Sequence, residues 1–335
     1  MIPAIFGLSG LTLTDDERAF FRDSDPAGYI LFGRNIENRE QLRRLTDVLR
    51  SLDGRDNVPI LIDQEGGRVA RMKSPEWPPF PSGATFDALY ERAPASAIEA
   101  ARLNAMALAA MLAEVGINVD CLPLLDVRQP GASDIIGDRA LGSEPMRVAA
   151  LGRAILGGLQ DGGVVGIVKH IPGHGRALLD THEALPVVTA TDRELQTDLA
   201  PFAALRDAAM AMTCHVIFEA WDPERPATLS PIVIDSVIRQ RIGFHGLLMS
   251  DDLDMKALSG DVPSRAADAV AAGCDIALNC WAKMDDMIGI ANALDPISTV
   301  SRARLEGAMD RVSGVADDRA FATLVDQRDA LLAVA

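Results

Sequence analysis

The centre of the chain reads Val164-Val-Gly-Ile-Val168, continued by Lys169-His-Ile-Pro-Gly-His-Gly175. The first part is an apolar run, which is typical of a buried β-strand. The Pro172-Gly173 pair then ends regular structure, so the polar side chains lie on a loop at the carboxyl end of that strand. We predict the fold from this unit, a buried strand followed by a polar loop.

Similar apolar runs recur along the chain, and each is followed by a segment of helical periodicity. The eight expected strands are 4–8, 28–32, 59–62, 117–121, 165–168, 211–215, 246–249 and 275–278. The helices expected between them are 15–22, 39–52, 94–115, 145–160, 192–207, 231–242, 264–272 and 282–294. Strands that alternate with helices pair in parallel, and eight such units fit a barrel of about 250 residues. We therefore predict an α/β fold, a single (β/α)8 TIM barrel.

The whole chain, residues 1–335, is expected to form one catalytic domain. Its tail from about 299 to 335 is helical by pattern, and these C-terminal helices are expected to pack outside the barrel. Thr191 or Asp192, and Ser230, are expected to cap helices, and Gly116 is expected to end one. An open doubly wound sheet is the alternative, although residues 7–10 make a weak glycine fingerprint for a dinucleotide.

The composition of the chain argues against a nucleic-acid-binding protein and against a membrane-spanning protein. Of the 335 residues 48% are hydrophobic, and the formal net charge of −16 argues against a nucleic-acid interface, which needs a basic face. The four cysteines form no Cys-x-x-Cys pair, which favours reduced, buried thiols. The first residues carry no basic leader, and no apolar run approaches the roughly 18 residues of a membrane span. We expect a cytoplasmic monomer that binds neither nucleic acid nor membrane.

Polar side chains follow nearly every expected strand, which is where a TIM barrel builds its active site. They are Asp63 to Arg71 after the third strand, then Asp126, Arg128 and 136–139, the 169–182 loop, His215, 250–255 and Asn279. We therefore expect the functional site at this end of the barrel.

Asp251 directly follows an expected strand, so it lies at the barrel mouth, partly shielded from water. A carboxylate in that place can attack an electrophilic carbon or stabilise positive charge. Asp is also a favoured helix cap, so of the pair Asp251 and Asp252 we expect one to serve chemistry and the other to cap the next helix.

Asp180 and His182 are spaced as a base and the group that orients it. A carboxylate bonded to one imidazole nitrogen fixes the tautomer, and a pKa near 6.5 suits proton transfer at neutral pH. A surface Asp-His pair is the alternative. Together with Asp251, the pair would supply the two functions of a retaining glycosidase.

A zinc-dependent hydrolase is an alternative from a different class of enzyme. Its metal ligands would be His170, His174, His182 and Asp180. An i, i+4 histidine pair binds metal best on a helix, and Pro172-Gly173 argues against a helix here. We expect no metal and no cofactor.

Four basic residues are candidates to hold substrate oxygens: Arg71, Arg139, Lys169 and His170. Buried cations are rarely unpaired, so ion pairs with Asp63 and Asp138 are expected as well. Glu65 and Arg68 are expected to be structural, and His245 to lie on the surface.

These motifs resemble family 3 glycoside hydrolases, and more narrowly bacterial β-N-acetylhexosaminidases of the NagZ type. The matching segments, in order over residues 1–300, are 63–71, 136–139, 169–175 with 180–182, 213–217 and 250–255. The resemblance implies that Asp251 is the nucleophile and His182 the general acid/base, with Asp180 as its partner. It also implies that the sugar contacts Asp63, Arg71, Arg139, Lys169 and His170, and we add His215 to this set.

The implied reaction is exo-hydrolysis of terminal β-N-acetylglucosamine, with retention through a covalent glycosyl-Asp intermediate. The implied substrates are N-acetylglucosaminyl anhydro-N-acetylmuramyl peptides in cell-wall recycling. Cys214 and the apolar 176–179 loop depart from the family pattern, and the second leaves aglycone contacts open.

Three alternatives remain. Other family 3 β-glycosidases usually take a carboxylic acid from a second α/β domain, whereas the helical tail here leaves that role to His182. A phosphorylase is the second alternative, because a histidine acid/base does not repel phosphate as a carboxylate would. A non-catalytic sugar-binding barrel is the third.

Overall fold

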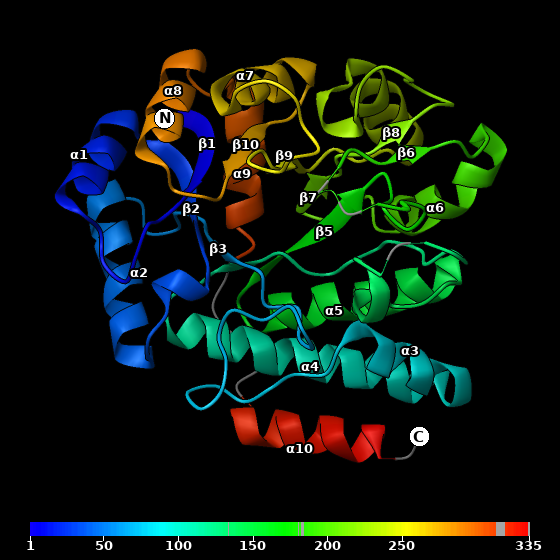
Figure 1. Cartoon of the computed structure of the whole chain (residues 1–335). Coiled ribbons are helices and arrows are strands. Elements are labelled where there is room, and N and C mark those ends of the chain that lie inside the picture. Colours follow the sequence, from blue (N-terminus) through cyan, green and yellow to red (C-terminus); the bar gives the residue numbers. More distant parts are fainter. Residues whose placement is uncertain (133, 180, 182–183, 313–318, 334–335) are drawn as a thin grey trace.

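The computed structural model describes residues 1–132, 134–179, 181, 184–312 and 319–333. In this part of the chain eight parallel strands close into a barrel, in the order β1-β10-β9-β7-β5-β4-β3-β2 (Figure 1). The strands are β1 (Ile2–Gly7), β2 (Pro26–Leu31), β3 (Ile60–Ile62), β4 (Val119–Asp120), β5 (Val165–Ile171), β7 (Met210–Thr213), β9 (Leu247–Asp252) and β10 (Ile276–Asn279). Each overlaps one of the eight apolar runs. The predicted TIM barrel is confirmed, and the open sheet is wrong.

The predicted helices are also present, with shifts of a few residues at their ends. They are α1 (Asp15–Ser24), α2 (Arg39–Asp53), α4 (Pro94–Glu114), α5 (Pro145–Asp161), α6 (Asp192–Ala204), the π-helix η4 (Val233–Ile242), α7 (Val262–Ala272) and α8 (Met284–Ala293). Thr191 caps α6 in a capping box with Glu194, and Ser230 Oγ accepts a hydrogen bond from Val233 N. Gly116 follows α4 with a φ of 78°.

Several short elements were not predicted. They are α3 (Gly83–Arg92), the two-stranded sheet of β6 (Val187–Val188) and β8 (Ile217–Phe218), and the 3₁₀ turns η1 (Gly33–Asn35), η2 (Gly137–Arg139) and η3 (Ala227–Leu229). No side chain caps α3, and the helix is held by burial of Phe86 and Leu89. Strands β6 and β8 pair with each other from distant parts of the sequence, so local patterns do not reveal them.

The two C-terminal helices, α9 (Thr299–Met309) and α10 (Phe321–Leu332), occupy different places. Helix α10 packs against α4 on the outside, as expected (Figure 1). The apolar side of α9 instead joins the barrel interior, where Leu305 and Met309 share a core with Ile5, Leu61 and Val165. Helix α9 therefore closes the amino-terminal end of the barrel, and the opposite end carries the loops.

Helix α4 is long and apolar enough to cross a membrane by length and composition alone, and it is the one such helix among the described residues. In the fold, however, 67% of its apolar window is buried, and it packs against α5 and α10. Its apolar character is explained by this position in the helical layer. The four cysteines are free and buried, as expected.

Candidate active site

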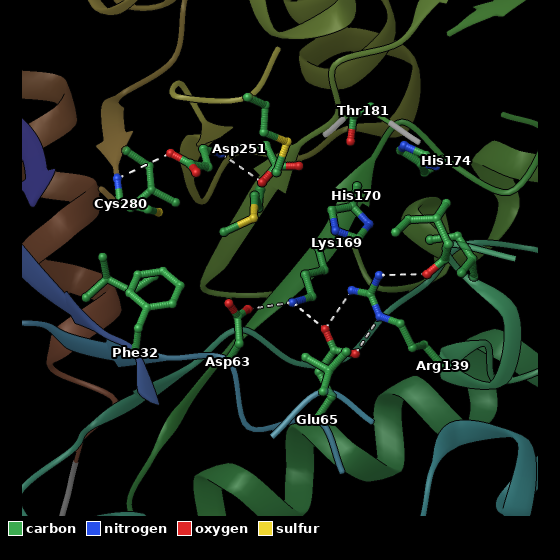
Figure 2. A pocket seen from close by; sticks show the side chains of 18 of the residues that line it. Phe32, Asp63, Glu65, Arg139, Lys169, His170, His174, Thr181, Asp251 and Cys280 are labelled. Carbon is green, nitrogen blue, oxygen red and sulfur yellow. Dashed lines mark hydrogen bonds and ion pairs between the residues drawn. The ribbon is translucent and has the colours of Figure 1, made fainter. Parts of the chain in front are cut away.

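A cavity of about 270 Å³ opens at the carboxyl ends of the strands. Its lining includes Phe32 after β2, the loop after β3, Lys169 and His170 in β5, Asp251 in β9 and Cys280 after β10 (Figure 2). This is the end of the barrel where polar residues were expected to gather.

One wall of the cavity is a network of alternating charges (Figure 2). Lys169 Nζ lies 3.0 Å from Asp63 Oδ1 and 2.7 Å from Glu65 Oε1. Arg71 Nη2 donates to the other oxygen of Asp63, Oδ2, at 3.0 Å. Arg139 donates two hydrogen bonds to Glu65, from Nε to Oε2 at 2.8 Å and from Nη2 to Oε1 at 2.7 Å. These ion pairs fix the side chains in one arrangement. Their remaining donors and acceptors are therefore already oriented toward a molecule bound in the cavity.

Burial and charge oppose each other in this network. Burial would raise the pKa of Asp63, but the charges of Lys169 and Arg71 outweigh it and hold the pKa below its ordinary value. Burial would likewise lower the pKa of Lys169, and the carboxylates of Asp63 and Glu65 raise it instead. Asp63 and Lys169 are therefore both ionised at neutral pH.

Asp251 lies at the end of β9 and is 8% exposed. One of its oxygens accepts a hydrogen bond from Asp252 N at 2.8 Å. Burial raises its pKa, but attraction to His170 and His215 outweighs this and leaves the pKa below its ordinary value. Asp251 thus presents an ionised, buried carboxylate to the cavity, which is the state a nucleophile requires.

A second buried carboxylate, Asp126, orients His170. Its Oδ2 lies 2.7 Å from His170 Nδ1, and its Oδ1 accepts bonds from the backbone of His170 and of His174. Burial raises the pKa of Asp126, yet the attraction of His170 lowers it to about 2. An ionised carboxylate can only accept, so His170 Nδ1 donates, and the ring is fixed with Nε2 free for another partner.

His215 is fully buried and does not line the cavity. Its Nε2 donates to the carbonyl of Asp252 at 2.9 Å, and its Nδ1 lies 2.8 Å from Thr228 Oγ1. Thr228 also bonds Thr213, which accepts from Asp251 N at 3.3 Å. The expected contact of His215 with substrate is thus not favoured by its position, because His215 lies outside the cavity lining and bonds the backbone next to Asp251.

Asp252 does not cap the next helix, contrary to the expected division of roles. Asp261 caps α7 by accepting from Ser264 N at 2.8 Å. Asp252 instead accepts bonds from Cys280 N and from the indole nitrogen of Trp281, both at 3.2 Å. Burial, and then repulsion from Asp254, raises the pKa of Asp252 to about 8. Asp252 therefore ties the loop after β10 to β9 beside Asp251.

Two predicted residues, Asp180 and His182, lie outside the described residues. Thr181 between them is described and lines the cavity (Figure 2). Its carbonyl accepts a hydrogen bond from Ala257 N at 3.1 Å. This contact places Thr181 against the loop that follows Asp251.

A family model, the glycosyl hydrolase family 3 N terminal domain, matches residues 7–315 of the chain. The chain belongs to family 3 of the glycosyl hydrolases. A β-hexosaminidase of Aromatoleum aromaticum is 36% identical to this glycosidase over 318 residues, which are 92% of this chain and 87% of that protein.

Solved structures agree with this family 3 assignment. NagZ from Neisseria gonorrhoeae in complex with N-trifluoroacetyl-D-glucosamine has a TM-score of 0.87 and 29% identity, covering 99% of this chain and 97% of that chain. The same NagZ in complex with zinc ion has a TM-score of 0.87 and 30% identity, with 98% of both chains covered.

The cavity of this family 3 glycosidase brings together six of the residues singled out from the sequence: Asp63, Arg71, Arg139, Lys169, His170 and Asp251. Asp63 forms the expected ion pairs, whereas Asp138 pairs with Arg68 at 2.8 Å, not with one of the candidate cations. His245 is on the surface, as predicted.

Glu65 was expected to be structural, and its central place in the charged wall was missed. It links Lys169 to Arg139, so it joins the loops after β3 and β4 to β5. The signal available in the sequence was its position two residues after Asp63, at a strand end. Its partners follow from the closure of the barrel, which the sequence order alone does not give.

Proposed function

We propose that this family 3 enzyme is a retaining exo-β-N-acetylglucosaminidase with Asp251 as its nucleophile. The observation that carries the proposal is the ionised, buried carboxylate of Asp251 on a cavity whose opposite wall is lined by fixed polar groups. The β-hexosaminidase relatives and the glucosamine derivative bound by the gonococcal NagZ support the choice of sugar.

In the first step an oxygen of Asp251 attacks the anomeric carbon, and the bond to the leaving oxygen breaks. His182, oriented by Asp180, donates its proton to that oxygen. In the second step His182 removes a proton from water, which attacks the same carbon and releases Asp251 as a carboxylate. Two displacements at one carbon retain the anomeric configuration.

The charged wall is proposed to hold the sugar hydroxyls through Asp63, Arg71, Arg139, Lys169 and His170. Each cation is already paired, so it can donate to a hydroxyl without an unpaired charge being left in the cavity. A cavity of about 270 Å³ suits one sugar ring better than several, which supports cleavage at a chain end. We assign His215 to positioning Asp251, not to binding.

The nucleophile is tested by Asp251→Gly with added azide. The variant should lose hydrolysis of an aryl β-N-acetylglucosaminide, and azide should restore turnover with an α-glycosyl azide as product, because the small anion attacks from the vacated side. A β-configured azide, or unimpaired hydrolysis without azide, would refute the assignment of Asp251.

The acid/base is tested by the dependence on the leaving group. His182→Ala should slow substrates with poor leaving groups far more than activated aryl ones, since only the former need protonation. The pair Asp126 and His170 is a second candidate for this function, because His170 is oriented by an ionised carboxylate and lines the cavity. If His170→Ala, and not His182→Ala, shows the leaving-group dependence, the second candidate is correct.

The physiological substrates proposed are N-acetylglucosaminyl anhydromuropeptides of cytoplasmic cell-wall recycling, and residues 1–335 are proposed to act as one catalytic domain and a monomer. Purified enzyme should release N-acetylglucosamine from such a muropeptide and elute with a mass near 35.8 kDa. Twice that mass would contradict the monomer, and failure to cleave the muropeptide would contradict the pathway.

Phosphorolysis and zinc hydrolysis predict different products and requirements. We expect free N-acetylglucosamine, with or without phosphate, and full activity after chelation. Among the described residues no cluster of three or more His, Cys, Asp or Glu side chains is arranged to hold a metal ion. A sugar phosphate product, or activity lost with chelator and restored by zinc, would favour the alternatives.

A further inference from the structure

His174, on the loop after β5, is a buried polar side chain that the proposed mechanism does not use. It is 4% exposed and lines the cavity next to Thr181 and His170 (Figure 2). Its backbone nitrogen bonds Asp126, but its ring Nδ1 has no hydrogen-bond partner among the described residues. A buried polar atom without a partner is costly, so each one in a folded protein calls for an explanation, such as a catalytic role or a bound molecule that satisfies it.

The charge state of His174 is set by its surroundings. Burial, and then repulsion from His170, lowers its pKa to about 4, although Asp126 and Asp251 act in the opposite direction. The ring is therefore neutral at physiological pH and carries one proton. A proton on Nδ1 would be an enclosed donor without an acceptor, so the proton belongs on Nε2, the nitrogen that can reach a molecule in the cavity.

We propose that His174 Nε2–H donates a hydrogen bond to the carbonyl oxygen of the 2-acetamido group of the bound sugar. Resting on the proposed function, this makes His174 a residue that selects N-acetylated sugars. The charged wall offers ionised groups to hydroxyls, whereas His174 lies on the side of the cavity with Thr181 and Asp251, where the substituent next to the anomeric carbon must lie (Figure 2). An uncharged donor matches an uncharged oxygen that can only accept.

The test compares variants that keep or remove the donor. His174→Gln places an amide N–H near the position of Nε2, His174→Asn places one near Nδ1, and His174→Leu removes both. Aryl N-acetyl- and N-trifluoroacetyl-glucosaminides serve as substrates, because fluorine weakens the carbonyl oxygen as an acceptor. We expect kcat/KM for the N-acetyl substrate to fall about 3- to 10-fold in the Leu and Asn variants and to be largely restored in the Gln variant.

The preference for N-acetyl over N-trifluoroacetyl should decrease in the Leu and Asn variants and persist in the Gln variant. The Leu variant should also melt about 1–3 °C higher than the parent, because it lacks the unpaired buried nitrogen. A structural histidine would give the opposite shift in Tm. An unchanged acyl preference in the Leu variant, or equal losses in the Gln and Asn variants, would overturn the proposal. Failure of the Asp251 assignment would show separately, in the azide products, with the acyl preference still dependent on His174.

Discussion

At the residue scale, Lys169 is the side chain on which the charged wall depends. It is 2% exposed and neutralises two carboxylates, Asp63 and Glu65, which are themselves buried or nearly so. Removing one partner of a buried ion pair leaves an uncompensated charge, which costs far more than the pair contributed.

Lys169→Met should therefore destabilise the fold by about 3–5 kcal/mol and abolish sugar binding. The control is Arg44→Met, whose pair with Glu40 is exposed on both sides and worth at most about 1 kcal/mol. Urea unfolding of both variants measures the difference. Similar losses in the free energy of unfolding of the two variants would mean that the buried ion pairs of Lys169 contribute no more to stability than an exposed pair does.

Asp252 makes stability depend on pH in an unusual direction for a carboxyl group. Because folding raises its pKa to about 8, the folded protein keeps a proton that the unfolded chain releases near pH 4. The stability from this proton is complete below the unfolded pKa and is lost as the pH rises through about 8.

Asp252→Asn should remove this dependence, since the amide does not titrate. Between pH 5 and pH 8.5 the Tm of the parent should fall more than the Tm of the variant. Differential scanning fluorimetry at both pH values provides the comparison. Parallel declines in the two proteins would show that Asp252 is already ionised in the folded state.

Some site residues followed from the sequence because each stands directly after an apolar run, as Asp63, Lys169 and Asp251 do. Strand ends converge in a barrel, so this rule needs no knowledge of pairing. Glu65, Asp126 and His174 are different, because their importance comes from partners on other loops. That information exists only after the strands have closed.

At the element scale, the apolar runs predicted all eight strands, because buried parallel strands read as continuous hydrophobic segments. Helix α3 and the place of α9 were not predicted. Both are decided by tertiary burial, of Phe86 under α3 and of Leu305 at the barrel floor. An amphipathic pattern indicates that a helix buries one face, but it does not indicate which other element covers that face.

The loop that follows β5 approaches the backbone after β4 so closely that Gly175 has no room for a side chain. A Cβ there would lie 2.0 Å from the carbonyl oxygen of Val127. This approach holds the loop that carries His174 next to the segment after Asp126.

Gly175→Ala should therefore displace the loop, lower Tm by several degrees and reduce kcat/KM at least about tenfold, in the range of overpacking costs. Gly10→Ala is the control, because a Cβ at Gly10 meets nothing within 4 Å. It should change neither quantity appreciably. A Gly175→Ala enzyme as active and stable as the control would show that the loop can move without consequence.

At the scale of the whole molecule, the two ends of the barrel differ: one is closed by apolar packing, and the other carries the candidate active site. Helix α9 closes one end with apolar side chains, and α10 covers α4 on the flank. The opposite end is left to loops whose charged groups neutralise one another, in a chain whose net charge is −16. The buried charges of Asp63, Glu65 and Lys169, which neutralise one another, thus line the cavity that contains Asp251.

The proposed mechanism requires that Asp251 forms a covalent bond with the sugar. A 5-fluoro N-acetylglucosaminyl fluoride should react once with each enzyme molecule and accumulate, because fluorine slows release of the sugar more than its attachment. Proteolysis and mass spectrometry then locate the added mass. We expect one glycosyl group, attached to the carboxylate of Asp251. A label on any other side chain, or turnover without an accumulated adduct and with inversion of configuration, would contradict it.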